Sequence, residues 1–261
     1  PGDYNFKFYD VDSKASLSQK VTITHEHPVL VIDNVGGDDL IDSGDHGKPV
    51  NVTGEAHNVL DGSTVDLEIA GNHYSATVQG GHWTVTVPGS DMSKLADQNL
   101  LVNGVVTDVG GGTATAQHHL VVAADPLSLH ASVDLKEDAI VTGMGQVFPG
   151  QQVGSVDHPG TFQGNFGTLT VSADGRYTYT LSNGTKSIQA LLSGTNARDN
   201  FLIPITEASG QTHSAVVAVN IEGTDDAPVI SGTLEAERAI NQGQWTHLNA
   251  SGHLDLTDAD S

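Results

Sequence analysis

The chain has 261 residues, no cysteine, and 32 Asp and Glu against 10 Lys and Arg, which gives a formal net charge of −22. This charge argues against nucleic acid as a partner, because phosphates would be repelled, and the lack of cysteine excludes a disulfide framework. Hydrophobic residues make up 37% of the chain and are strongly patterned, which excludes a disordered acidic chain. No apolar run approaches the roughly 18 residues of a membrane span, so we expect no membrane insertion.

The pattern of residues 1–27 predicts one β-hairpin. Phe6 and Phe8 alternate with polar residues, and Val21 and Ile23 do so again after an acidic turn. An isolated hairpin is marginally stable in water. We therefore expect this segment to be the end of a preceding repeat, or a pair of strands donated to a partner sheet.

Residues 28–125 are predicted to form an Ig-like β-sandwich. Short runs of period-two alternation follow one another, and Gly80-Gly81 joins two of them as a hairpin. We expect Trp83 to lie in the core rather than on a ligand-binding surface, because it is on the apolar side of its run. The predicted inward residues are Val65, Leu67, Ile69, Tyr74, Ala76, Val78, Trp83, Val85 and Val87.

Residues 126–228 are predicted to form a second sandwich of the same kind. Asp174-Gly175 is a strong two-residue hairpin signal between two alternating runs. Residues 188–192 form a short apolar patch, which indicates a helical turn or a crossing loop. The predicted inward residues are Leu169, Val171, Tyr177, Tyr179, Leu181, Phe201, Ile203, Ile205, Val217, Val219 and Ile221. Pro228 closes the unit, and residues 229–261 are expected to begin a further repeat, so that the chain is a slice through a tandem array.

Two segments resemble known repeats of bacterial surface proteins. GTLTVSADGRYTYTLSN, SIQAL and GTDDAP, all within 126–228, resemble the VCBS repeat. The run DGSTVDLEIAGNHYSATVQGGHWTVTV and its continuation resemble the bacterial Ig-like repeats of the same adhesins. The resemblance implies an all-β chain of tandem Ig-like and cadherin-like antiparallel sandwiches. It also implies an extracellular, calcium-loaded part of an RTX-type adhesin on the bacterial cell surface, exported by type I secretion.

Acidic residues gather at predicted turns and junctions, where calcium could bind. Calcium takes six to eight oxygen ligands, and loops with acids one to three residues apart can supply several of them. Alternatively, these acids form turns through hydrogen bonds to nearby backbone and contribute solubilising charge. The candidate ligands are Asp10, Asp12, Asp38, Asp39, Asp42, Asp108, Glu137, Asp138, Asp225, Asp226, Asp258 and Asp260.

The resemblance groups some of these acids into sites. Similarity to Ig-like adhesin repeats implies that residues 37–42 and Asp108 form one calcium site. Asp225-Asp226 is similar to the acidic linker of cadherin-type repeats, in which calcium stiffens the junction. Glu137-Asp138 would then be its counterpart at the entry to the same unit.

Other chemistry has little support in the sequence. His25 and His27, or His118 and His119, could bind zinc, but they lack cysteine and helical spacing, so surface or turn histidines are the preferred interpretation. There is no nucleophile elbow and no phosphate-binding glycine loop. We expect no enzymatic activity.

The predicted function is that of a calcium-stabilised stalk or extender in cell adhesion and biofilm formation, with neighbouring repeats of the same chain as partners. The alternative is a ligand-binding module for host or surface glycans or peptides. Its only support is Trp245 and the glycine- and glutamine-rich loops around Phe148 and Phe162. A concave, aromatic-lined pocket would favour this alternative.

Overall fold

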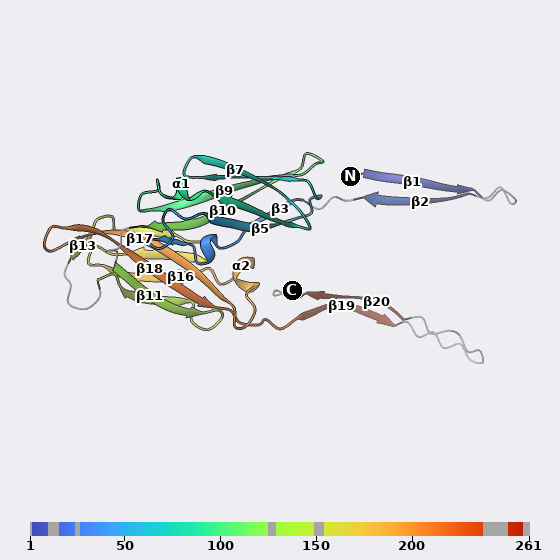
Figure 1. Ribbon diagram of the computed structural model, residues 1–261. Helices are drawn as coiled ribbons and strands as arrows, with labels where there is room; N and C mark the ends of the chain where they lie inside the picture. The colour runs from blue at the N-terminus through green and yellow to red at the C-terminus, as the bar shows by residue number, and fades with distance from the viewer. Residues whose placement is uncertain are drawn as a thin grey trace. The chain divides into compact units, whose positions relative to one another are not determined.

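The chain forms two compact β-rich units, residues 1–124 and residues 125–261 (Figure 1). The computed structural model describes residues 2–9, 16–23, 27–124, 129–148, 154–236 and 250–257. Each unit contains a sandwich of antiparallel sheets with one parallel strand pairing. The predicted all-β fold class is confirmed.

The sandwich of the first unit packs a three-stranded sheet against a five-stranded one. The order of the smaller sheet is β3 (Val29–Ile32), β5 (Val50–His57) and β8 (His82–Val87). The order of the larger sheet is β4 (Leu40–Asp42), β10 (Thr113–Ala123), β9 (Gln98–Thr107), β6 (Thr64–Ile69) and β7 (Asn72–Thr77). A 3-10 turn, η1 (Val35–Gly37), and a short helix, α1 (Gly89–Met92), lie in the connections.

Strict alternation of buried and exposed residues builds the core of the first unit. On β6 and β8 every second side chain is buried, as the pattern predicts. Trp83 is 2% exposed, so its predicted place in the core is confirmed. Its ring lies over Gly54, the residue opposite it on β5, and its Nε1 donates a hydrogen bond to the carbonyl of Glu55.

The sandwich of the second unit is built from two four-stranded sheets. One sheet has the order β11 (Leu129–Lys136), β18 (Thr212–Glu222), β17 (Asn196–Glu207) and β13 (Gly154–Val156). The other has the order β12 (Thr142–Gln146), β16 (Arg176–Leu181), β15 (Gly167–Val171) and β14 (Gly160–Gln163). A single helical turn, α2 (Lys186–Gln189), overlaps the start of the apolar patch at residues 188–192. This agrees with the helical turn that was one of the two alternatives for the patch.

All eleven residues predicted to face inward in the second unit are buried. The hairpin at Asp174-Gly175 is confirmed, with Gly175 at φ 83°, a left-handed conformation that glycine adopts without strain. Tyr179, fully buried, donates a hydrogen bond of 2.6 Å to Asp199. Burial, reinforced by the Asp199 carboxylate, raises the pKa of Tyr179, so the phenol stays protonated and can act as a donor.

Two further hairpins lie in the terminal segments. β1 (Gly2–Tyr9) pairs with β2 (Ser16–Ile23), and β19 (Val229–Ala236) pairs with β20 (Ala250–Thr257), both antiparallel. The first hairpin was predicted from the alternation in residues 1–27. That the two segments belong to neighbouring repeats stays a prediction.

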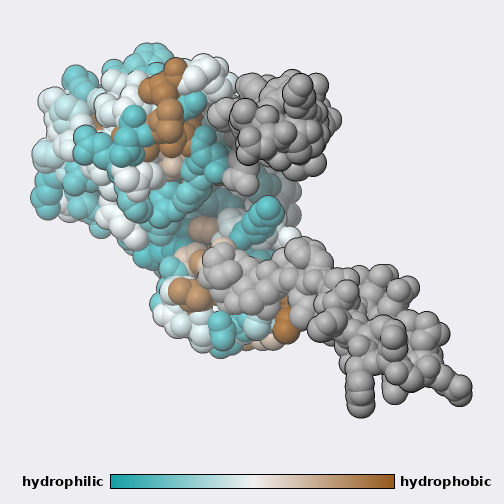
Figure 2. All heavy atoms as spheres, turned by 90° about the vertical axis from the view of Figure 1, so that its right-hand side faces the viewer, coloured by the Kyte–Doolittle hydropathy of each residue, from teal (hydrophilic) through white to brown (hydrophobic). Residues whose placement is uncertain are grey.

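The surface agrees with the acidic composition. Figure 2 shows a mostly hydrophilic face with small, separate hydrophobic patches. Within the described ranges, no helix is both long and apolar enough to cross a membrane.

Gly54 provides a test of the core of the first unit. A Cβ atom on this residue would collide with the carbonyl of Val31 and the ring of Trp83. Since overpacking of this kind typically costs about 1 to 3 kcal/mol, Gly54→Ala should lower the melting temperature of the first unit. Gly160→Ala is the control, because a Cβ there meets open space. Equal melting of the two variants would contradict this account of the packing.

Candidate metal centre

Three of the predicted acidic ligands meet at one end of the second unit. Ligand oxygens of Glu137, Asp138 and Asp226 all lie within 4.8 Å of one another. Glu137 and Asp138 directly follow β11, and Asp226 lies four residues beyond β18. β11 and β18 are parallel neighbours, so their carboxyl ends emerge at the same edge of the sheet.

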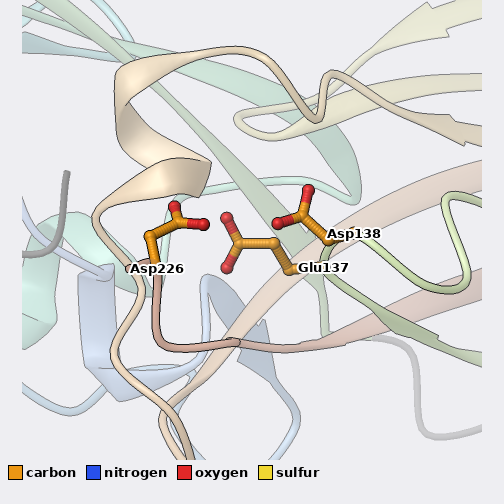
Figure 3. Close-up of side chains that lie close together, drawn as sticks. All are labelled: Glu137, Asp138 and Asp226. Atoms are coloured by element: carbon orange, nitrogen blue, oxygen red, sulfur yellow. The ribbon is translucent and has the colours of Figure 1, made fainter. Parts of the chain in front are cut away.

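Glu137 is the central group of this cluster. It is completely buried, and Figure 3 shows its carboxylate between those of Asp138 and Asp226. Its Oε1 accepts a hydrogen bond of 2.9 Å from the side chain of Gln189 in α2, and its Oε2 accepts one of 3.1 Å from the backbone N–H of Thr224. The Thr224 hydroxyl donates to the Glu137 carbonyl at 3.1 Å. These bonds fix the carboxylate and join the segment after β18 to the turn after β11.

Asp138 is exposed, and hydrogen bonds to Asn183 hold both its backbone N–H and its carboxylate. It adopts φ 57°, a left-handed conformation that Asp tolerates better than most residues. Its N–H donates to Oδ1 of Asn183 at 3.1 Å, and its carboxylate accepts a hydrogen bond from the Asn183 amide. The second unit therefore positions Asp138 by a two-way contact with the loop that precedes α2.

The charge and donor types of the cluster suit a hard cation. Ionised carboxylates are acceptors only, so three of them at this distance repel one another unless a cation or a proton intervenes. The neighbouring Lys136 is 2.7 Å from Glu222 and so forms an ion pair with a different acid. An all-oxygen donor set is typical of Ca²⁺, with backbone carbonyls or water completing six to eight ligands. The residues present therefore fit calcium.

The prediction that residues 37–42 and Asp108 share one calcium site is wrong. β4 pairs with β10 at Val121–Ala123, whereas Asp108 precedes the opposite end of β10, which begins at Thr113. Eight positions along a strand separate these two ends by roughly 27 Å. No single ion can bridge that distance.

The acids of residues 37–42 hydrogen-bond to nearby backbone instead. Asp39 is 1% exposed, and its Oδ1 accepts a hydrogen bond of 2.7 Å from the Val35 N–H. Oδ1 of Asp38 accepts from the Leu40 N–H at 3.3 Å, and Oδ1 of Asp42 accepts from the Gly44 N–H at 2.6 Å. Turn formation, the alternative for these acids, describes these contacts. Oδ1 of Asp39 also accepts a long-range hydrogen bond of 2.7 Å from Nε2 of His118.

The prediction that His118 is a surface or turn histidine is wrong. It is 6% exposed and makes a buried pair with Asp39. The sequence gives no sign of this pairing, because the two residues are 79 positions apart. Burial lowers the pKa of its neighbour His119, with a smaller contribution from the charge of His118.

Of the remaining predicted ligands, only Asp225 can be compared with the cluster. Asp225 is exposed and is not one of its three members. Asp10, Asp12, Asp258 and Asp260 lie outside the described residues, as does His25. Sequence reasoning missed Asn183, Gln189 and Thr224, which hold the cluster in place. All three lie within the quoted segments, since Asn183 ends GTLTVSADGRYTYTLSN, Gln189 lies in SIQAL and Thr224 lies in GTDDAP, but nothing in these segments shows that the residues contact the acids.

The residues named in support of a ligand-binding module, and one surface hollow of the first unit, can be located in part. A surface hollow of about 460 Å³ is lined by Asn103, Gly104, Val105, Thr115, Ala116 and Gln117, none of them aromatic. Phe148 is buried in the core of the second unit and Phe162 packs against that core. Trp245 lies outside the described residues.

No family model matches this sequence, and no curated protein matches it either. Among solved structures, the chain is similar to a bacterial immunoglobulin-like domain from the M. primoryensis ice-binding adhesin, with 29% identity over 38% of this chain and 98% of that one, at a TM-score of 0.30. It is 19% identical to a Ca²⁺-stabilized adhesin with which an Antarctic bacterium binds ice, over 88% of this chain and 59% of that one, at a TM-score of 0.32. It is 20% identical to a tetra-tandem repeat in the extending region of a large adhesion protein, over 97% and 63% of the two chains, at a TM-score of 0.32. At these TM-scores the likenesses assign no ligand and no activity to this chain.

Asp108 should support the first unit as a turn residue. Hydrogen bonds from the backbone N–H groups of Leu60 and Gly110 hold its pKa below the ordinary value. A lowered folded-state pKa means that the stabilisation is complete above the unfolded pKa, about 3.9, and is lost as the pH falls through the lower folded value. Asp108→Asn should therefore melt earlier than the wild type at pH 7, and the gap should close as the pH falls below about 4. A gap that stays constant down to pH 2.5 would contradict this role.

Proposed function

We propose that this chain is a calcium-stabilised, extracellular module of a large bacterial surface adhesin, in which it acts as a stalk or extender. The observation that carries the proposal is the convergence of Glu137, Asp138 and Asp226 at the end of the second unit, where the chain leaves β18 towards Pro228. An all-oxygen cluster on a β-sandwich is a site for a structural cation.

Calcium would act there by linking two chain segments. One is the turn at Glu137-Asp138, and the other is the segment after β18 that contains Asp226. Thr224 already joins these two segments through two hydrogen bonds to Glu137. A bound ion would add ligand bonds across the same gap and would remove the repulsion between the three carboxylates.

The whole-chain charge adds a second reason for a cation. A net charge of −22 destabilises compact states by self-repulsion, and bound divalent ions reduce it. Outside cells, calcium affinities on the order of 10⁻⁴ to 10⁻³ M are sufficient. Such a module would be loaded only after export, in agreement with the cell-surface location and type I secretion that the VCBS-like and Ig-like segments imply.

The proposed partners are neighbouring repeats of the same adhesin. Ca²⁺ at the end of the second unit would restrict the angles at which the following segment leaves it, so that a distal binding region is held away from the cell. A role in cell adhesion and biofilm formation, and RTX-type ends elsewhere in the protein, belong to the same proposal.

Thermal unfolding tests the calcium centre. At about 5 mM calcium, a dissociation constant of 10⁻⁴ to 10⁻³ M adds about 1 to 2.3 kcal/mol to the stability of the second unit. Its melting temperature should therefore rise in calcium well beyond its value in magnesium or EDTA. The double substitution Glu137→Gln with Asp226→Asn should abolish the rise.

Asp66→Asn is the control for that experiment. Asp66 is an exposed acid on β6 of the first unit, so its substitution removes charge without touching the cluster. The calcium response of this variant should match the wild type. Equal melting of the wild type in EDTA and in calcium would remove calcium from the proposal.

A further inference from the structure

The outer face of the β3–β5–β8 sheet in the first unit carries two histidines around one glutamate. Glu55 and His57 are two residues apart on β5, so their side chains leave the same face of the sheet. His82 begins β8 and pairs directly with Glu55 in the strand register. Three metal-binding side chains are thus gathered by the pairing of two strands.

The two imidazoles lie at opposite oxygens of the same carboxylate. Nε2 of His57 is 3.0 Å from Oε2 of Glu55, and Nδ1 of His82 is 3.8 Å from Oε1. The side chains of His57, Glu55 and His82 are 54%, 43% and 72% exposed. Ion pairs this exposed contribute about 0 to 1 kcal/mol each, so stability alone is a weak reason for this arrangement.

We propose that Glu55, His57 and His82 form a binding site for a divalent transition metal of the zinc class. Two imidazole nitrogens and one carboxylate are a ligand set that zinc uses, with a fourth position left for water or an outside ligand. Ligand atoms around one tetrahedral zinc ion lie about 3.4 Å apart, as follows from metal–ligand bonds of about 2.1 Å. Each histidine is close to the carboxylate, at 3.0 and 3.8 Å, but to a different oxygen of it, so the three ligand atoms are not yet gathered around one point.

Binding of one ion by both imidazoles requires a change of side-chain conformation at this exposed site. In the structure they flank the carboxylate, one at each oxygen, so His57 or His82 must turn towards the other. The backbone beneath them is well fixed, because the Glu55 carbonyl accepts the Trp83 Nε1 hydrogen bond and the Ala56 N–H donates to the Gly81 carbonyl at 2.8 Å. The site therefore combines a backbone held by hydrogen bonds with exposed side chains.

The chemistry of this site differs from that of the candidate calcium centre. Nitrogen ligands suit zinc, copper and nickel, whereas the all-oxygen cluster of the second unit suits calcium. β3 lies on the edge of β5 opposite to β8. In the pairing of β3 with β5, Val31 lies opposite Glu55 and Val29 lies opposite His57. These two valines are 40% and 45% exposed and lie on the same face, so they give the site an apolar border.

Calorimetric titration of the whole chain with zinc chloride, in buffer that already contains saturating calcium, tests the site. Calcium competes with zinc for the oxygen cluster, and the variants below assign bound zinc to Glu55, His57 and His82 whether or not calcium occupies that cluster. We expect one zinc equivalent that is weakened at least about tenfold by His57→Ala, by His82→Ala and by Glu55→Gln. Zinc should also shift the imidazole resonances of His57 and His82 in nuclear magnetic resonance spectra.

His130→Ala is the matched control, because His130 is an exposed histidine of the second unit. This variant should bind zinc as the wild type does. The ligand variants should keep the wild-type circular dichroism and melting without zinc, since their side chains are exposed. Zinc binding that is unchanged in His57→Ala and His82→Ala, or no binding by the wild type, would overturn the proposal.

Discussion

The parallel pairing of β11 with β18 is the interaction on which the candidate metal centre depends. The first strand of the second sandwich lies beside the last strand of that sandwich over eight residue pairs, from Leu129↔Ala215 to Lys136↔Glu222. Two segments whose paired residues are 86 positions apart in sequence therefore leave the sheet together. Without this pairing, Glu137 and Asp226 would have no reason to meet.

The buried carboxylate of Glu137 shows how the sandwich accommodates a charge at its end. An ionised carboxylate removed from water is costly unless its oxygens are satisfied. Gln189 and Thr224 supply donors from two other segments, so each oxygen of Glu137 has a hydrogen-bond partner. The same bonds hold this carboxylate in place beside Asp138 and Asp226, where the proposed cation would bind.

The first unit uses a parallel pairing differently. β4 joins the end of β10, and Asp39 there turns inward to the buried His118 rather than outward to other acids. The outer face of its smaller sheet instead brings together the nitrogen and oxygen atoms of Glu55, His57 and His82, through strand pairing and alternation along β5. The two units thus share an architecture but bring together different donor atoms, and donor type decides which cations each can bind.

The sequence alone determined the parts of this protein that depend on local pattern. Alternation along a strand places every second residue on one face, so the buried residues of β6, β8, β15 and β16 could be predicted without knowing their partners. Asp174-Gly175 could likewise be predicted as a turn, because glycine tolerates the left-handed conformation that a tight hairpin requires. The family resemblance singled out Asp225-Asp226 in the linker after the unit and Glu137-Asp138 at its entry, but it did not predict that three of these four acids meet.

Only the tertiary structure decided which distant acids are neighbours. Strand order and direction are set by packing over the whole sandwich, and a short acidic motif carries no information about them. For this reason residues 37–42 and Asp108, which look alike as acidic turns, lie at opposite ends of β10. For the same reason the pairs Asp39–His118 and Glu55–His82 could not be found from spacing, since each joins segments that long-range strand pairing brings together.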